Sequence, residues 1–165
     1  YNNGDYISPP KKGLKAFSRN YTSTLFDKEG YEEGLHLNLF DGFEDTESYL
    51  DYMDAFFGSI DANDLLGMLN TWQMGDIGKH QKFNNNTKEA LANINCPALV
   101  MPSSTDLSFP ARNNIPEVNE MPEAELVVIN TKHGHLAGGM STALTSQEDV
   151  TFIDKNIKEF LKKIT

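Results

Sequence analysis

Two short apolar runs in the second half of the sequence decide the fold: Ala98-Leu99-Val100-Met101 and Glu125-Leu126-Val127-Val128-Ile129. Continuous apolar runs of this length, bounded by turn residues, are typical of strands buried on both faces of a parallel sheet. A helix is expected between them at 111–120, where Pro116 would kink it. The clearest amphipathic helix follows at 149–164. The order strand, helix, strand, helix predicts an α/β fold at the end of a doubly wound parallel sheet.

The residues up to about position 92 differ in composition from the second half of the sequence, because they are rich in aromatic, Asn and acidic residues. They contain no convincing strand. Helical spacing of their apolar residues predicts helices at 14–26, 47–57, 61–73 and 87–94. Thr46 and Asp61 are the expected N-caps of the second and third of these helices. The polar stretch 75–86 is expected to be a loop. We therefore divide the chain into a helical segment at 1–92 and an α/β segment at 93–165.

Two polar residues follow the predicted strands, Asp106 after the first and His135 after the second. Ligands of open α/β sheets bind at the carboxyl ends of the strands, and the two loops could bring these side chains together. A carboxylate that accepts a hydrogen bond from one imidazole nitrogen fixes the ring tautomer and stabilises the imidazolium that forms in catalysis. The pattern predicts a catalytic acid–base pair, although either residue alone is also explained as an ordinary turn or loop residue.

An Asp after one strand, a Gly-His after the next and a final helix follow the order of the α/β-hydrolase fold, whose triad runs Ser, Asp, His. Within that fold, the chain resembles the C-terminal part of the homoserine O-acetyltransferase family. The matching stretches are Gly4-Asp5-Tyr6, Pro9-Pro10, Gly13-Leu14, Asp61-Ala62-Asn63-Asp64-Leu65-Leu66, Thr71-Trp72-Gln73, Asp76-Ile77, Thr105-Asp106-Leu107, Phe109-Pro110, Gly134-His135 and Ala137-Gly138-Gly139. The resemblance implies that Asp106 is the triad acid, that His135 is the triad base, and that residues from about 14 to 80 form a helical lid.

The function implied by the resemblance is two-step acyl transfer from an ester or thioester to an alcohol. The implied partners are a small-molecule acyl donor and an alcohol acceptor, with no cofactor and with acyl-CoA as a candidate co-substrate. The sequence departs from the family at Leu136-Ala137-Gly138-Gly139, where enzymes that acetylate homoserine typically have Asp followed by Ala-Phe. Ester hydrolysis by the same fold therefore stays open. So does a non-catalytic interaction module, with a homodimer formed through the helical lid.

The nucleophile of such a triad has no counterpart in the sequence. A serine of this fold sits in a Gly-x-Ser-x-Gly elbow, and no such pattern occurs in the 165 residues. The chain begins at Tyr1 rather than Met, and two strands alone cannot bury both faces of a sheet. We therefore expect a fragment that is inactive by itself, with the serine in an N-terminal part of the fold.

Composition excludes several other classes of function. The 14 Lys and Arg residues against 24 Asp and Glu give a net charge of −10, which argues against nucleic acid or an anionic membrane as partner. No apolar run approaches the roughly 20 residues that span a bilayer, and no leader opens the chain, so we expect a cytoplasmic protein. His133 lies near His135, but no third ligand indicates a metal site. We expect His36 at the surface and Cys96, the single cysteine, to be buried.

Overall fold

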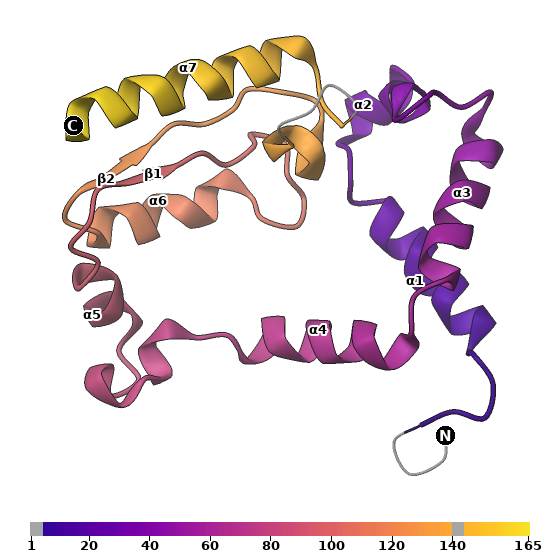
Figure 1. Ribbon diagram of the computed structural model, residues 1–165, viewed down its shortest axis with the longest axis horizontal. Coiled ribbons are helices and arrows are strands. Elements are labelled where there is room, and N and C mark those ends of the chain that lie inside the picture. Colours follow the sequence, from indigo (N-terminus) through magenta and orange to yellow (C-terminus); the bar gives the residue numbers. More distant parts are fainter. Residues whose placement is uncertain (1–4, 140–143) are drawn as a thin grey trace. The chain divides into compact units, whose positions relative to one another are not determined.

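The computed structural model describes residues 5–139 and 144–165, so that Gly4, in the first of the matching stretches, lies outside the described residues. The chain forms two compact units, coloured along the sequence in Figure 1. The first comprises Tyr1–Ser23 and Phe43–Gly75, and the second comprises Thr24–Gly42 and Asp76–Thr165. The predicted division at residue 92 concerns the organisation of a larger fold and stays a prediction.

The second unit contains the predicted parallel strands. β1 (Ala98–Val100) pairs with β2 (Ala124–Leu126) in parallel, with Ala98 opposite Ala124. A further bridge between Ser103 and Ile129 extends the pairing beyond both strands. Helix α6 (Ala111–Glu120) connects the strands and α7 (Gln147–Ile164) follows them. Figure 1 shows α6 and α7 on opposite sides of the strand pair, which is the predicted α/β arrangement.

The burial of the strands differs from the prediction. Every residue of β1 and β2 is only half-buried, because the sheet of the described residues has two strands and each strand has a neighbour on one side alone. One buried cluster of this unit lies beyond the ends of the strands and against α7. It contains Ile129, Ala137 and Ile153, with Met101 and Ile157 packed against it.

The other elements of the second unit are short: α2 (Lys28–Glu32), η1 (Leu35–Asn38), η2 (Ile77–Lys79), η3 (Gln81–Phe83), α5 (Thr87–Ala92) and η4 (Gly134–Gly138). The predicted loop at 75–86 thus contains two 3-10 turns, which carry no helical period. His36 is not at the surface as expected: it is 4% exposed and its ring lies 5.1 Å from that of Tyr31. Cys96 was expected to be buried but is exposed, because it precedes the half-buried strand.

The first unit is helical and consists of α1 (Lys11–Thr22), α3 (Thr46–Gly58) and α4 (Ala62–Met74). Helices α1 and α3 pack together through the ring of Phe57, which lies 5.2 Å from Phe17 and 5.4 Å from Tyr21. Arg19 on α1 also forms a bidentate ion pair with Asp54 on α3, with Nη2 2.8 Å from Oδ2. The guanidinium of Arg19 holds the pKa of the Asp54 carboxyl below its usual value.

The ends of these helices correct two predictions. Helix α3 is capped by Asp45 and not by Thr46, because the Asp45 carboxylate accepts the backbone N–H of Ser48 at 2.8 Å and the Ser48 hydroxyl accepts that of Asp45. Helix α1 ends at Thr22, well before the predicted end at Phe26. Helix α4 is capped by Asp61, as predicted. No helix within the described ranges has the length and apolarity needed to cross a bilayer.

Candidate active site

Asp106 lies in the turn that follows β1, and the backbone of the same turn fixes its carboxylate. Oδ1 accepts the backbone N–H of Ser108 at 2.7 Å and that of Phe109 at 2.9 Å. This is the local bonding by which Asp shapes turns. Because Oδ1 is held in this way, Oδ2 is left to accept a hydrogen bond from another part of the chain.

His135 lies in η4, and a glycine positions its backbone. Gly134 has φ +53°, a left-handed conformation in which a side chain is strained. A Cβ at Gly134 would lie 2.5 Å from the carbonyl oxygen of Leu25. The backbone N–H of His135 donates to that same carbonyl at 2.8 Å. A glycine before His135 is therefore needed for the loop to reach the segment that carries Leu25.

The structure brings the two predicted site residues together. Nδ1 of His135 lies 3.0 Å from Oδ2 of Asp106, and the side chains are 26% and 11% exposed. An ionised carboxylate only accepts hydrogen bonds, so Nδ1 carries the proton and Nε2 is the basic nitrogen of the neutral ring. The ring of Phe109 lies 5.6 Å from the imidazole, centroid to centroid. This geometry suits a general base whose protonated form is stabilised by a neighbouring carboxylate.

A cavity of about 260 Å³ opens beside the pair. The residues that line it come from the end of β1, the Asp106 turn, α6 and η4: Val100, Met101, Pro102, Ser103, Asp106, Phe109, Asn114, His135 and Gly138. The wall is mixed, with apolar side chains from the strand end and polar groups from the two loops. Ligand sites commonly have this combination.

His133 takes part in a different contact. Its Nδ1 lies 3.3 Å from Oδ2 of Asp149, in the first turn of α7. Within residues 5–139 and 144–165, no three His, Cys, Asp or Glu side chains gather as a metal-ligand group. Sequence reasoning assigned no role to Asp149 or to Thr131, whose hydroxyl donates to it. The one available signal was weak: Thr131, His133 and His135 alternate along a single loop.

Comparison with known proteins identifies relatives along almost the whole chain. The sequence is 33% identical over 165 residues to a probable esterase of Corynebacterium glutamicum, covering 98% of this chain and 45% of that protein. It is 30% identical over 125 residues to an ethyl acetate hydrolase of Pseudomonas veronii, covering 75% of this chain and 35% of that protein. A homoserine O-acetyltransferase of Emericella nidulans is 25% identical over 162 residues, covering 96% of this chain and 32% of that protein. No protein-family model matches the sequence.

Two solved structures with a similar fold are likewise named as ester hydrolases. An acetylester hydrolase from Corynebacterium glutamicum superposes with a TM-score of 0.78 at 32% identity, over 92% of this chain and 42% of that chain. The acetyl esterase MekB superposes with a TM-score of 0.78 at 27% identity, over the same shares of the two chains, 92% and 42%. The chain thus spans less than half the length of these relatives.

Proposed function

We propose that this chain, which has the fold of the C-terminal part of the α/β-hydrolases, supplies the acid and the base of an ester-hydrolysing enzyme. The observation that carries the proposal is the 3.0 Å contact between Asp106 Oδ2 and His135 Nδ1 beyond the ends of two parallel strands. The relatives named as ester hydrolases add support at 33% and 30% identity. The activity is proposed for a protein in which this chain is the C-terminal part.

In the proposed mechanism, Nε2 of His135 takes the proton of a serine hydroxyl as its oxygen attacks the ester carbonyl. The Asp106 carboxylate keeps Nδ1 protonated and stabilises the positive charge on the ring. The C–O bond of the ester breaks, and the same nitrogen returns the proton to the departing alcohol. A water molecule, deprotonated in turn by Nε2, then attacks the acyl carbon. The bond to the serine oxygen breaks, Nε2 returns the proton to that oxygen, and the acid is released. The sequence contains no Gly-x-Ser-x-Gly elbow, so we assign the serine to residues N-terminal to this chain.

The cavity beside the pair supports a short acyl group as the substrate class. Its volume is about 260 Å³, and Val100, Met101 and Phe109 give it apolar wall. Apolar wall next to the base would hold a methyl or ethyl group while the carbonyl carbon faces the nucleophile. Acetate esters of small alcohols are therefore the proposed substrates.

Acyl transfer to an alcohol is the second candidate, and the similarity to a homoserine O-acetyltransferase favours it. The same base would deprotonate the acceptor alcohol in place of water, with acyl-CoA as the candidate donor. That relative is 25% identical to this chain, against 33% and 30% for the two ester hydrolases. These relatives support hydrolysis better than the acyl transfer implied by the resemblance.

The first test is the turnover of p-nitrophenyl acetate by the whole protein and its variants. His135→Ala and Asp106→Asn are expected to lower kcat by about 10³- to 10⁴-fold, because the base or its orientation is lost. Asp154→Asn is the matched control, because this carboxylate is about half exposed on α7 and forms an ion pair with Lys158 at 2.6 Å. Wild-type turnover in both site variants would refute the proposed roles.

The second test separates hydrolysis from transfer. The protein is given an acetyl ester or acetyl-CoA together with excess homoserine, and the products are separated by mass spectrometry. Free acetate is the expected main product. If more O-acetylated alcohol than acetate forms, the function is acyl transfer and not hydrolysis. Asp106 and His135 would have the same roles in that reaction.

A further inference from the structure

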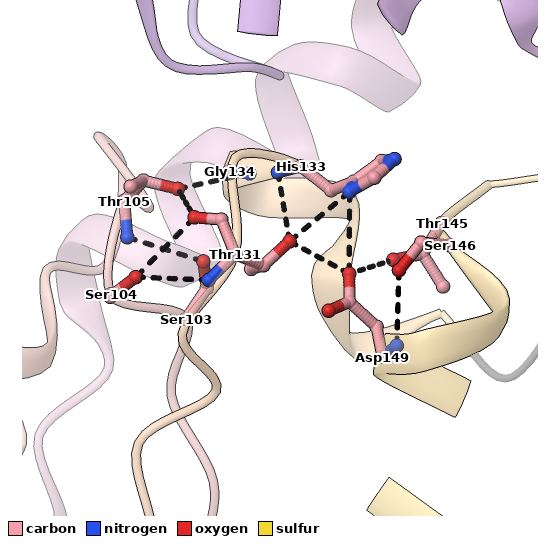
Figure 2. Close-up of polar contacts among 9 residues, drawn as sticks. All are labelled: Ser103, Ser104, Thr105, Thr131, His133, Gly134, Thr145, Ser146 and Asp149. Carbon is pink, nitrogen blue, oxygen red and sulfur yellow. Dashed lines mark hydrogen bonds and ion pairs between the residues drawn. The ribbon is translucent and has the colours of Figure 1, made fainter. Parts of the chain in front are cut away.

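A buried carboxylate that the proposed mechanism does not use lies close to the histidine loop (Figure 2). Asp149 is 6% exposed, in the first turn of α7. Its Oδ2 accepts the hydroxyl of Thr131 at 2.7 Å and that of Thr145 at 2.6 Å, and lies 3.3 Å from Nδ1 of His133. Three donors that converge on one oxygen compensate the burial of the charge. We call Thr131, His133, Thr145 and Asp149 the Asp149 cluster.

The single proton of the Thr131 hydroxyl determines which groups in the cluster donate hydrogen bonds and which accept them. A hydroxyl has one proton, and Thr131 gives it to Asp149, so its oxygen can only accept in its other bonds. The backbone N–H of His133 donates to this oxygen at 3.1 Å, and Nδ1 of His133 lies 3.1 Å from it. Nδ1 of His133 must therefore carry a proton. The Asp149 carboxylate thus holds both the side chain of Thr131 and, through it, the backbone of His133.

The backbone of Thr131 connects the cluster to both loops of the candidate active site, as Figure 2 shows. Its carbonyl oxygen accepts the hydroxyl of Thr105 at 2.8 Å, and its N–H donates to Oγ of Ser104 at 3.2 Å. Oγ1 of Thr105 in turn accepts the backbone N–H of Gly134 at 3.2 Å. Thr105 directly precedes Asp106 and Gly134 directly precedes His135. The network therefore reaches the residue directly before each member of the catalytic pair.

We propose that Asp149 is a positioning residue, which acts through Thr131 to hold the His135 loop and the Asp106 turn in register. The proposal rests on the proposed function, since it concerns the alignment of the same pair. Asp149 and Thr131 do not line the cavity beside the pair, so they have no contact with substrate there. Their effect is on the distance between Nδ1 of His135 and Oδ2 of Asp106, and small displacements of a catalytic group have large effects on rate.

The test uses Asp149→Asn and Thr131→Val in the whole protein. Both are expected to lower kcat for p-nitrophenyl acetate by about 10- to 100-fold, with a much smaller change in KM, because alignment is lost while the cavity wall is kept. Thr131→Ser retains the hydroxyl and is expected to restore most of the activity. Asp154→Asn removes an exposed carboxylate from the same helix and is expected to leave kcat unchanged. The double variant with both Asp149→Asn and Thr131→Val is expected to have a kcat no lower than that of the slower single variant. The reason is that either change breaks the same connection from Asp149 through Thr131 to the two loops.

A second measurement follows the pair directly, by proton NMR of the hydrogen-bonded Nδ1–H of His135. This signal, assigned by its loss in His135→Ala, is expected to broaden or disappear in Thr131→Val and to return in Thr131→Ser. If Asp149→Asn does not fold, the two Thr131 variants decide. Folded Asp149 and Thr131 variants with wild-type kcat and an unchanged signal would overturn the proposal. If the wild-type protein hydrolyses no ester, only the proposed function is rejected. The NMR signal of His135 then still tests whether Asp149 and Thr131 position the pair.

Discussion

Gly134 holds a left-handed backbone conformation directly before His135, and a side chain there would meet the backbone of Leu25 and Phe26. Gly134→Ala is therefore expected to lower the free energy of unfolding by about 1–3 kcal/mol. Gly138 lies in the same 3-10 helix, and nothing lies within 4 Å of a Cβ added to it, so Gly138→Ala is the matched control. Urea denaturation of both variants measures the difference. An equal loss in both would mean that the strain at Gly134 is not the cause.

His36 makes the stability of the second unit sensitive to acid. Burial lowers the pKa of its imidazole from the usual value of 6.5. The unfolded chain therefore binds a proton near pH 6.5 while the folded chain does not. The contribution of neutral His36 is complete above that pH and is lost as the pH falls below it, towards the lowered pKa of the folded state. The loss of unfolding free energy between neutral pH and about pH 5 is expected to be smaller in His36→Gln. An unchanged loss in that variant would contradict the assignment.

The sequence could locate the two residues of the proposed acid–base pair but not the residues next to them. Asp106 and His135 were predictable because each follows a strand, and the ends of neighbouring parallel strands lie side by side. The roles of Thr131 and Asp149 depend on which hydroxyl reaches which carboxylate between a loop and a helix. Single side-chain contacts of that kind produce no periodic pattern in the sequence from which they could be predicted. The same holds for His36, whose burial follows from the fold around a short 3-10 helix.

At the scale of single elements, helix starts were predicted to within a few residues, but the identity of a cap was harder to predict. Both Asp45 and Thr46 can cap a helix, and only Asp45 does so in the structure. Asp45→Ala is expected to cost about 1 kcal/mol of unfolding free energy, because it removes the bond to the Ser48 N–H. Thr46→Ala is expected to cost less, since Thr46 is inside the first turn, where Ala favours the helix. Thermal unfolding measures the loss of stability in each variant. A larger loss in Thr46→Ala than in Asp45→Ala would support Thr46 as the N-cap, as the sequence predicted.

Helix α4 shows why an apolar stripe predicts a helix better than it predicts burial. The spacing of Leu65, Leu66, Met68 and Trp72 correctly indicated a helix, and Leu65 is buried. Leu66, Met68 and Trp72 are 55%, 38% and 52% exposed. Periodicity depends on the residues of one element alone, whereas burial depends on what packs against it. The half-buried residues of β1 and β2 have the same explanation.

At the scale of the whole molecule, the proposed mechanism needs an acid, a base and a nucleophile. The described residues bring the proposed acid and base together, with 3.0 Å between Asp106 Oδ2 and His135 Nδ1. No Gly-x-Ser-x-Gly elbow occurs in the sequence to present a hydroxyl to Nε2. An oriented base without a nucleophile cannot form an acyl-enzyme, so it gives little rate enhancement for an ester that does not react readily with imidazole itself.

The polypeptide of residues 1–165, assayed alone, is therefore expected to hydrolyse an unactivated acetate ester no faster than its own His135→Ala variant. The measurement is acetate release over hours at high protein concentration, because a slow background reaction must be resolved from true turnover. A longer protein that includes the N-terminal part is expected to release acetate in a His135-dependent way. Turnover by residues 1–165 that disappears in His135→Ala would show that the nucleophile lies within this sequence. In that case the base would act on one of its own hydroxyls, such as those in the Asp106 turn, and the serine would no longer be assigned to residues before Tyr1.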